Sequence, residues 1–392
     1  MFSDRSNWNL SPNALSLLLQ RKKSAGDIVF DLTESNPTRV GLDYDAETIL
    51  AALAQPQSIV YQPDPRGLEE ARQAIAAYYR DRGQRLEIDS ILLTASTSEA
   101  YSILFKLLGN PKDEILIPRP GYPLLFYLAC FESLQSIAYP LRYDVRKGWF
   151  IDMDVLPALI TPNTKAIVLV NPNNPTGSYV KQQELAALDA VCHRHDLALI
   201  VDEVFSDFET AATPDRVRTA VNRSGALTFV LNGLSKMVGL PQVKLGWIVG
   251  GGDPDLAKAA LSRLEMMLDF YLSVATPVQH AAQRLLCGRK AIQRQMLARI
   301  TANGRFLAER VAQTANSRVL LREGGWYAII EISDEVSDED RVLQLLEHDN
   351  TLVHPGYFYE FNREGFVVVS LLTPVEPFQA GIIRLIKRFG RT

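Results

Sequence analysis

Short apolar runs alternate with helical patterns from about residue 65 to residue 290, and this alternation leaves few folds open to the chain. The runs are rich in β-branched residues and nearly continuous in apolar character, as expected of strands that are buried on both faces. Such strands pair in parallel and need helices on both sides of the sheet. The sequence therefore predicts an α/β fold with a mostly parallel central sheet. The strand candidates are residues 91–93, 114–117, 166–170, 198–201, 227–231 and 243–249.

The pattern changes after about residue 290. A long charged helix over 291–312 precedes a strand at 326–332, a helix at 338–348, a strand at 367–372 and a last helix. The full 392 residues exceed what one hydrophobic core usually holds. We therefore expect a large domain over 41–290 and a smaller α+β domain that combines 1–40 with 291–392.

Composition argues against several classes of partner. The net charge is −4, and no run of basic residues with interleaved aromatics offers a footprint for nucleic acid. The three cysteines lie far apart and form no pattern typical of disulfide frameworks or zinc sites. No apolar run is long enough to span a bilayer, and the first residues do not resemble a signal peptide. We expect a cytoplasmic protein without a metal, a membrane or a nucleic acid as partner.

The segment Asn232-Gly-Leu-Ser-Lys236 follows one of the predicted strands directly. A lysine in a cleft at the end of a strand can have a lowered pKa and form a Schiff base. A lysine after a strand can equally be a surface cation. Taken alone, the segment therefore leaves both readings open.

Asp202 ends another buried strand, where ligands bind in open α/β sheets. An ionised carboxylate there needs a cation, and the pyridinium nitrogen of pyridoxal 5′-phosphate (PLP) is one such partner. A helix N-cap is the plainer alternative for this residue, whereas no nearby histidine favours a metal.

Two further segments follow strands. Residues 171–177, Asn-Pro-Asn-Asn-Pro-Thr-Gly, form a rigid turn from which Asn174 can reach the crevice. Residues 94–100 open a helix, and its free N–H groups and the hydroxyls of Ser96, Thr97 and Ser98 suit an anion such as phosphate. Alone, these segments would be a loop and an N-cap.

Together the four segments resemble the class I/II aminotransferase family, which has PLP fold type I, and the match runs in order along nearly the whole chain. Further landmarks are Asn36-Pro37 near the start, Tyr61 with Gly67 and Arg72, and Pro120-Gly-Tyr122-Pro. The resemblance implies a transaminase that moves an amino group from an amino acid or amine to a 2-oxo acid. It also implies a homodimer.

By this resemblance Lys236 carries PLP as a Schiff base, Asp202 pairs with its ring nitrogen, and Asn174 bonds its ring hydroxyl. The ring of Tyr122 stacks on the cofactor. The phosphate is held by Ser96, Thr97, Ser98, Ser235 and Lys244, and by Tyr61 from the other subunit. Asn36, Arg39 and Tyr357 are candidates for contact with the substrate.

Four positions depart from the family pattern. Phe205 stands where the family usually has Tyr, so one donor to the cofactor's ring oxygen is missing. Lys244 replaces an Arg, and Gly233 replaces a hydroxyl residue. Val368 stands where the family has the arginine that binds the substrate's α-carboxylate, and no Arg occurs between Arg363 and Arg384.

An unpaired carboxylate is costly to bury, so another cation serves or the substrate differs from an ordinary α-amino acid. Arg39 is the candidate for a relocated cation, although a solvated surface role fits it as well. His354, Tyr357 and Tyr359 surround a turn that resembles the family's substrate loop. A carbon–sulfur β-lyase, a decarboxylase and a non-catalytic PLP-fold sensor stay open as alternatives to a transaminase.

Overall fold

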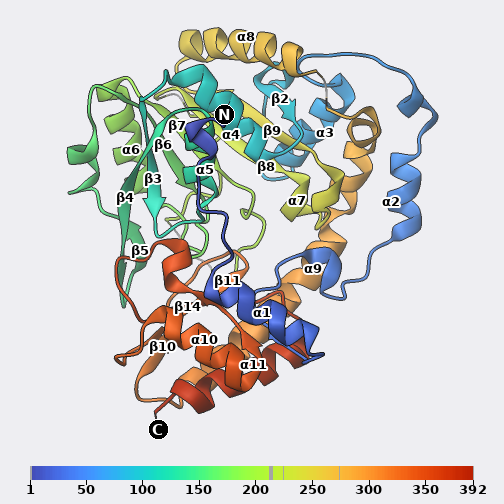
Figure 1. Ribbon diagram of the computed structural model, residues 1–392. Helices are drawn as coiled ribbons and strands as arrows, with labels where there is room; N and C mark the ends of the chain where they lie inside the picture. Colours follow the sequence, from blue (N-terminus) through green and yellow to red (C-terminus); the bar gives the residue numbers. More distant parts are fainter. Residues whose placement is uncertain (1, 212–214, 224, 273, 392) are drawn as a thin grey trace.

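The computed structural model of the chain describes residues 2–211, 215–223, 225–272 and 274–391. Within these ranges, eight strands form a central sheet in the order β2-β9-β8-β7-β6-β3-β4-β5 (Figure 1). All but β9 and β5 share one direction, and these two run antiparallel to their neighbours. The bounds are β2 (Ile91–Thr94), β3 (Glu114–Arg119), β4 (Gln135–Asp144), β5 (Gly148–Ile151), β6 (Thr164–Val170), β7 (Ala198–Asp202), β8 (Thr228–Gly233) and β9 (Gly246–Gly251). The α/β fold with a mostly parallel sheet is confirmed.

One predicted strand was placed too early. Residues 243–249 were expected to be extended, but a 3-10 turn spans Pro241–Val243 and Lys244 has a φ of 61°. A residue with positive φ breaks an extended run, so β9 begins only at Gly246. The β4–β5 hairpin was not predicted, because its partly buried residues lack a continuous apolar run.

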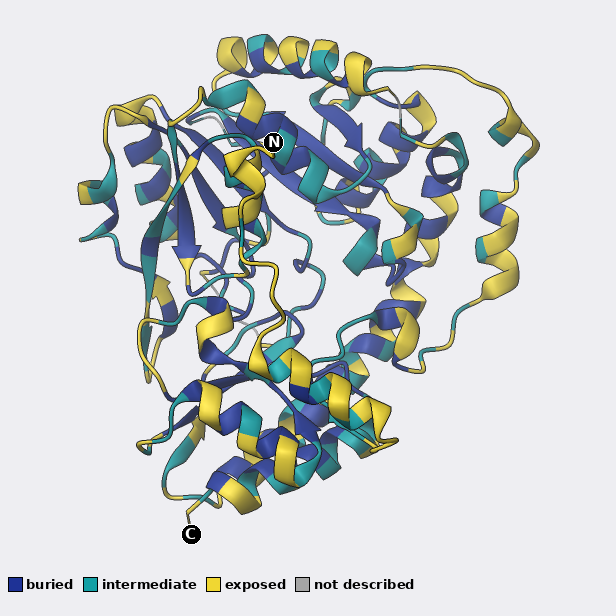
Figure 2. Cartoon of the chain, in the orientation of Figure 1, coloured by how far each residue is buried: buried dark blue, intermediate teal, exposed yellow. Residues whose placement is uncertain are grey.

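Helices cover both faces of the central sheet. Buried residues of α3 (Glu69–Arg80), α6 (Gln182–His195) and the first part of α9 (Thr276–Val311) pack on one face. Those of α4 (Thr97–Leu108), α5 (Leu124–Phe131) and α8 (Pro254–Tyr271) pack on the other. Figure 2 shows the strands mostly buried and the outer sides of these helices exposed. The two short helices of this part are α2 (Ala46–Leu53) and α7 (Leu234–Met237).

A smaller, antiparallel sheet lies below the central one in Figure 1, with the order β10-β11-β14-β13. Its strands are β10 (Ser317–Val319), β11 (Tyr327–Ile332), β13 (His354–Pro355) and β14 (Phe366–Ser370). Helices α10 (Asp338–Asp349) and α11 (Val375–Phe389) accompany it. The elements predicted at 326–332, 338–348 and 367–372 are therefore present, each shifted by at most two residues at either end.

Helix α9 links the two parts and is 36 residues long. It begins at Thr276, whereas the charged pattern predicted a start at 291. Its first turns are buried by Val278, Ala281 and Leu285 against the central sheet, so the charged pattern appears only further along. The predicted boundary at residue 290 lies inside this helix, and the division into two domains stays a prediction.

The N-terminal segment packs against the C-terminal part of the chain. Strand β1 (Phe30–Asp31) pairs in parallel with β12 (Thr351–Leu352). Helix α1 (Ala14–Ser24) contacts α10, and Leu18 is buried there with Leu346 and Leu352. Among the described residues, no helix combines the length and the apolar character needed to cross a membrane.

Candidate active site

A cavity of about 310 Å³ lies at the carboxyl ends of the parallel strands, where open α/β sheets bind ligands. The small sheet contributes Tyr327 to its wall, and the N-terminal segment contributes Ser35. Most of the predicted cofactor residues line it together: Ser96, Thr97, Ser98, Tyr122, Asn174, Asp202, Phe205, Ser235, Lys236 and Lys244. The topology therefore brings segments that lie far apart in the sequence to one place.

Lys236 lies on the one-turn helix α7, directly after β8. Burial lowers the pKa of its amine, and the nearby Asp202 carboxylate opposes that shift. The Nζ atom lies 5.6 Å from the ring centroid of Phe205 and 5.1 Å from that of Trp326. A lowered pKa favours the neutral form of the amine, which is the form that attacks a carbonyl group.

Asp202 ends β7 and is 8% exposed. Its two oxygens accept hydrogen bonds from Tyr101 Oη at 3.0 Å and from the Val204 amide at 3.0 Å. Burial nevertheless raises the pKa of Asp202 to about 6, against the opposing effect of these two bonds and of Lys236. A buried carboxylate with a raised pKa is stabilised by a cation, and a protonated pyridine nitrogen is one.

Asn174 lines the cavity, and its Oδ1 atom is buried without a hydrogen-bond partner in the protein. Buried polar atoms are almost always satisfied, so an orphan at a cavity wall indicates a ligand with a matching group. A buried amine with a lowered pKa, a buried carboxylate and an unpaired amide in one cavity fit the aldehyde, the ring nitrogen and the ring hydroxyl of PLP. The residues present therefore fit this cofactor.

One side of the cavity is formed by the start of α4, where the sequence predicts the phosphate site. Ser96 is the N-cap, and its Oγ accepts the Glu99 amide at 3.1 Å. The first amides of the helix and the side chains of Thr97, Ser98, Ser235 and Lys244 line the same cavity. Helix N-termini attract anions because the backbone N–H groups and the helix dipole favour negative charge.

Gly233, one of the departures from the family, has a steric reason. A Cβ atom there would lie 2.9 Å from the Leu245 carbonyl oxygen and 3.1 Å from the Gly246 Cα. A Cβ on Gly246 would in turn lie 2.8 Å from the Ser96 carbonyl carbon. The backbones of β8, β9 and α4 approach so closely here that the hydroxyl residue common in the family does not fit at position 233.

Phe205, a second departure, joins the cavity to the core of the small sheet. Its ring is 5% exposed and packs edge to face on Trp326, with 5.2 Å between the ring centroids. It belongs to the same buried cluster as Met296 of α9 and Val369 of β14. The position therefore has a packing role in addition to facing the cavity.

Val368 is not among the residues that line the cavity, although Tyr327 on the neighbouring strand is. Ser370 pairs with Tyr327 and Val368 pairs with Ile329, so Val368 is on the same face of the small sheet as Tyr327. Val368 is fully buried in a cluster with Tyr359, and the rings of Tyr122 and Tyr327 lie 6.5 and 6.3 Å from that of Tyr359. An aromatic cluster thus occupies the region next to this strand.

The predicted substrate residues do not line the cavity. Asn36 instead caps a 3-10 turn by accepting the Thr38 amide at 3.1 Å, and Arg39 is exposed. Tyr357 is 43% exposed, and Tyr61 is 71% exposed away from the cavity wall. Burial lowers the pKa of His354 to about 4, and its ring stacks on Phe358. Their assignments to the substrate, and that of Tyr61 to the cofactor, stay predictions.

Sequence reasoning missed three polar residues of the wall, Ser35, Tyr101 and Tyr327, as well as apolar ones. Tyr101 lies one helical turn after Thr97, and this spacing was a usable signal because the start of that helix was already assigned to the cavity. Ser35 and Tyr327 reach the cavity through the packing of the small sheet, for which the sequence carries no local signal.

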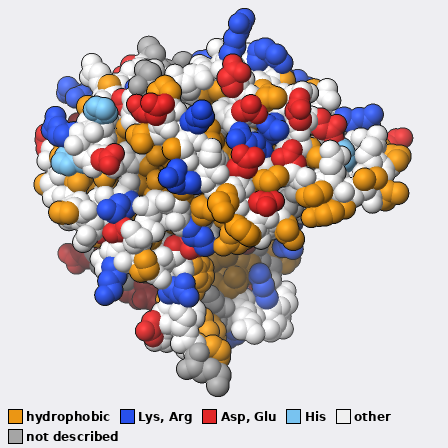
Figure 3. Space-filling model, turned by 90° about the horizontal axis from the view of Figure 1, so that it is seen from above, with side chains coloured by type: hydrophobic (Ala, Val, Ile, Leu, Met, Phe, Trp, Pro, Cys, Tyr) orange, Lys and Arg blue, Asp and Glu red, His pale blue; other side chains and the backbone are white. Residues whose placement is uncertain are grey.

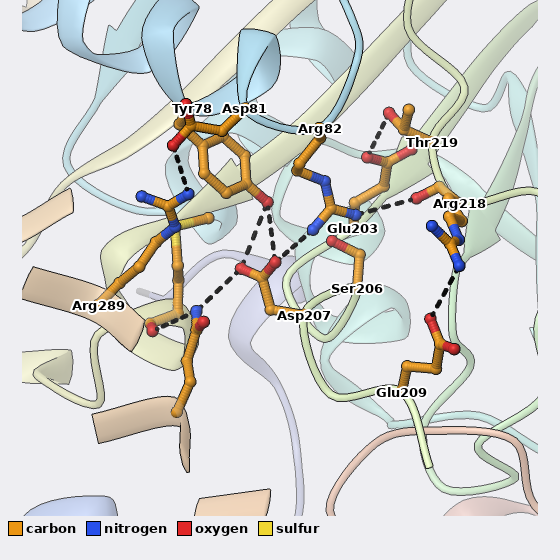
Figure 4. A network of polar contacts seen from close by, with 12 residues as sticks. Tyr78, Asp81, Arg82, Glu203, Ser206, Asp207, Glu209, Arg218, Thr219 and Arg289 are labelled. Atoms are coloured by element: carbon orange, nitrogen blue, oxygen red, sulfur yellow. Dashed lines mark hydrogen bonds and ion pairs between the residues drawn. The ribbon is translucent and has the colours of Figure 1, made fainter. Parts of the chain in front are cut away.

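Behind the cavity, a polar network fills the opposite side of β7 (Figure 4). Asp207 accepts hydrogen bonds from Arg82, from Tyr78 and, at 3.2 Å, from Gln293. The same amide of Gln293 donates to the Met237 carbonyl at 3.0 Å, one residue past Lys236. The network therefore connects α3 and α9 to the short helix that presents the lysine.

Glu203 belongs to this rear side. Its oxygens accept Thr219 Oγ1 at 2.8 Å and the Ala220 amide at 2.7 Å. Burial raises the pKa of Glu203 to about 7, against the effect of these bonds and of Arg82. Over the described ranges, histidine, cysteine and carboxylate side chains form no cluster suited to a metal ion.

Known proteins are similar to this chain in both sequence and fold. The profile of the family "Aminotransferase class I and II" matches residues 27–376. The glutamate-pyruvate aminotransferase AlaA of Escherichia coli K12 is 31% identical over 292 residues, which cover 74% of this chain and 70% of that protein. An alanine aminotransferase of Mycobacterium bovis is 28% identical over 389 residues, 94% of this chain and 86% of that protein.

Solved structures agree over nearly the full length. An aminotransferase from Escherichia coli has a TM-score of 0.87 at 25% identity, with 99% of this chain and 98% of that chain covered. An alanine aminotransferase from Pyrococcus furiosus has a TM-score of 0.88 at 24% identity, with 99% of each chain covered.

Proposed function

Because this chain belongs to the class I and II aminotransferases, a family of PLP enzymes, we propose that Lys236 carries the cofactor and moves the proton in each half-reaction. The protein is a PLP-dependent aminotransferase that acts on an amino donor and a 2-oxo acid. The observation that carries the proposal is the pairing of a buried amine at 236 with a buried carboxylate at 202 in one cavity.

The other cavity residues have distinct tasks in this proposal. Asp202 holds a positive charge on the ring nitrogen, Asn174 binds the ring hydroxyl, and Tyr122 covers the ring. Ser96, Thr97, Ser98, Ser235 and Lys244 hold the phosphate. When bound, PLP supplies an aldehyde that condenses with amines and a ring that withdraws electrons from the substrate carbon.

Lys236 is the general base at this site. Burial lowers the pKa of its Nζ and so favours the neutral amine, which can accept the proton from the substrate's α-carbon and release it again to complete the half-reaction. Asp202 keeps its two protein donors throughout and does not take part in proton transfer. The same lysine serves both substrates in turn, which predicts ping-pong kinetics.

Neutral donors hold the substrate carboxylate in this proposal. Of the described residues that line the cavity, Lys236 and Lys244 are the cations, and both are assigned to the cofactor. Asn174 and Tyr122 are assigned to the cofactor as well, so the hydroxyls of Ser35 and Tyr327 remain for the substrate. Hydrogen bonds from neutral groups are about half as strong as those from a guanidinium, so we expect weak selection for the carboxylate.

A donor screen tests this function. The relatives named glutamate-pyruvate and alanine aminotransferases make glutamate with pyruvate the first pair to assay. Each amino acid is compared with the amine that lacks its carboxylate. We expect kcat/KM for the amino acid to exceed that for the amine by no more than about a hundredfold, which is less than an arginine that binds the carboxylate would provide. If no donor in the screen supported activity, the proposal would be contradicted. Release of pyruvate and ammonia without an acceptor would point to a lyase.

We also propose that the enzyme is a homodimer in which Tyr61 completes the neighbouring site. Tyr61 and its neighbours Ile59 and Val60 are exposed, as are Phe270 and Tyr271 at the end of α8. In the view from above, hydrophobic side chains gather in groups between charged ones (Figure 3). Apolar surface of this kind is common where subunits meet.

Mixing two inactive variants tests the dimer. Tyr61→Ala and Lys236→Ala each impair the site, but a mixed dimer contains one site with both residues intact. Activity should therefore reappear after the two variants are unfolded and refolded together. Retained inactivity, or a monomer by light scattering, would refute the shared site while leaving the role of Lys236 untouched.

A further inference from the structure

A second cavity, of about 400 Å³, lies outside the active site between the β4–β5 hairpin and the small sheet. Four arginines from four separate segments line it: Arg119 at the end of β3, Arg142 on β4, Arg318 on β10 and Arg363 before β14. The aromatic residues Tyr143 and Trp149 form part of its wall. The catalytic mechanism uses none of these side chains.

The charge of this wall is one-sided, because no acidic residue is among the described residues that line it. The acids that pair with the arginines lie outside the lining. Glu360 pairs with Arg119, Asp152 with Arg142, and Glu331 with both Arg318 and Arg363. Four guanidinium groups therefore share three carboxylates.

Donor groups remain for a ligand. Arg142 and Arg318 each bond their acid through Nε, and in the described part of the chain their terminal amino groups have no acceptor. Trp149 is 6% exposed, and its indole Nε1 is buried without a hydrogen-bond partner. A buried donor that lacks an acceptor is costly. The side chains of the four arginines are 45% to 61% exposed, so their remaining N–H groups are accessible to a ligand from solvent.

We propose that this second cavity binds a small polyanion that carries phosphate or carboxylate groups. The planar fork of a guanidinium matches both groups in two parallel hydrogen bonds. The volume lies within the range of small-molecule sites. Tyr143 lies under Arg318 at 5.7 Å from the ring centroid, and this contact holds the cation in place over an apolar surface.

The ligand would connect the two parts of the molecule. Arg119 and Arg142 belong to the central sheet, whereas Arg318 and Arg363 belong to the region of the small sheet. Arg119 also bonds Glu360, which follows Tyr359, and it precedes the loop that carries Tyr122 into the active site. A bound polyanion therefore stabilises the contact between the central sheet and the small sheet, next to the loop that carries Tyr122.

Calorimetric titration of the PLP-loaded enzyme in a chloride buffer tests this inference. The probes are pyrophosphate, inorganic phosphate and citrate, with sodium chloride of equal ionic strength as the control. We expect saturable binding of pyrophosphate or citrate and a rise in Tm in proportion to the logarithm of its concentration. A stronger response to pyrophosphate assigns phosphate chemistry, and a stronger response to citrate assigns carboxylate chemistry.

The double variant Arg142→Gln/Arg318→Gln should bind the same probe at least about tenfold more weakly, because two charged donors are lost. The matched control is Arg305→Gln, an exposed arginine on α9 whose acid lies at 3.8 Å, and its affinity should equal that of the wild type. The absence of saturable binding to the wild-type enzyme overturns the proposal without any variant. Equal affinity in the double variant also overturns it.

Discussion

Asp202 and Glu203 are neighbours in the chain but lie on opposite faces of the sheet. Ile200 packs in the same buried cluster as Tyr101 of α4, and Val201 packs in that of α3, so the alternation along β7 separates the two acids. On the rear side, both oxygens of Glu203 have donors, and Asp207 beside it has three donor residues. On the cavity side, Asn174 Oδ1 has none and the amine of Lys236 is free of hydrogen bonds to the described residues. The carboxylates behind the strand have their donors within the protein, whereas the amide and the amine in front of it await a ligand.

The largest expected effect is on the cavity side. Lys236→Ala removes the group that carries the cofactor and moves the proton, so kcat should fall by at least about a thousandfold, while the stability of the fold is kept. Turnover and the visible absorbance of the bound cofactor are the measurements. Lys258→Ala on the exposed face of α8 is the control, and it should behave as the wild type. Substantial turnover in Lys236→Ala would refute the assignment of the active site.

The next effect is on the rear side and concerns stability. Asp207→Ala leaves the guanidinium of Arg82 without its acid and Gln293 with one acceptor fewer, so unfolding should become easier by about 3 kcal/mol. Chemical denaturation with the cofactor bound measures it. The double variant Arg82→Ala/Asp207→Ala should recover part of the loss. If Asp207→Ala left stability unchanged, the rear network would not be structural.

A matched pair of isosteric changes separates the two faces directly. Asp202→Asn should lower kcat by about a hundredfold, since a neutral amide does not hold a positive charge on the ring nitrogen. Glu203→Gln should leave kcat within about threefold, because it is buried on the other face and makes no contact with the cavity. Equal losses of activity in the two variants would contradict the division between front and rear.

Burial of Glu203 makes the stability of the fold depend on pH in a defined direction. Its carboxyl has a pKa of 4.5 in an open chain and about 7 in the folded protein. Below pH 4.5 the carboxyl is protonated in both the folded and the unfolded state, so it adds no pH dependence to stability. Between pH 4.5 and about 7 only the unfolded state loses the proton. Stability relative to Glu203→Gln should therefore fall as pH rises from about 4.5 to about 7, by roughly 3 kcal/mol in total. Denaturation of both proteins across this range measures the difference, and a rise would overturn the assignment of burial as the cause.

The smallest expected effect is at the boundary between the faces. Phe205→Tyr adds a donor next to the cofactor's ring oxygen, which favours the deprotonated form of the link between Lys236 and the cofactor, so the pKa of that link should fall by up to about one unit. A spectroscopic pH titration of the loaded enzyme measures it. An unchanged pKa would show that the new hydroxyl does not reach the cofactor.

The cofactor candidates named from the sequence come together in one cavity because their positions depend on strand ends. Asn174, Asp202 and Lys236 each follow a buried strand, and parallel strands bring their carboxyl ends to one edge of the sheet. The same logic located the helix start at Ser96. The direction and start of β9 were not predicted, since they depend on the positive φ of Lys244.

The substrate side was harder to predict because it depends on how the small sheet packs. Arg39 and Asn36 were chosen for their place in the sequence, and they are not among the residues that line the cavity, whereas the neighbouring Ser35 is. Tyr327 enters from a strand whose neighbours in space are distant in sequence. No periodicity or short motif encodes such a contact.

Helix α9 has a consequence for anyone who wants to study one half of the enzyme in isolation. Its 36 residues extend over about 54 Å without a break, from the layer that covers the central sheet to the core beside the small one. A truncation at residue 290 cuts through hydrogen-bonded turns of this helix and exposes buried apolar side chains on each fragment. Limited proteolysis should accordingly find no preferred cleavage site within α9. The two parts of the enzyme are therefore better compared inside the intact protein than as separate fragments.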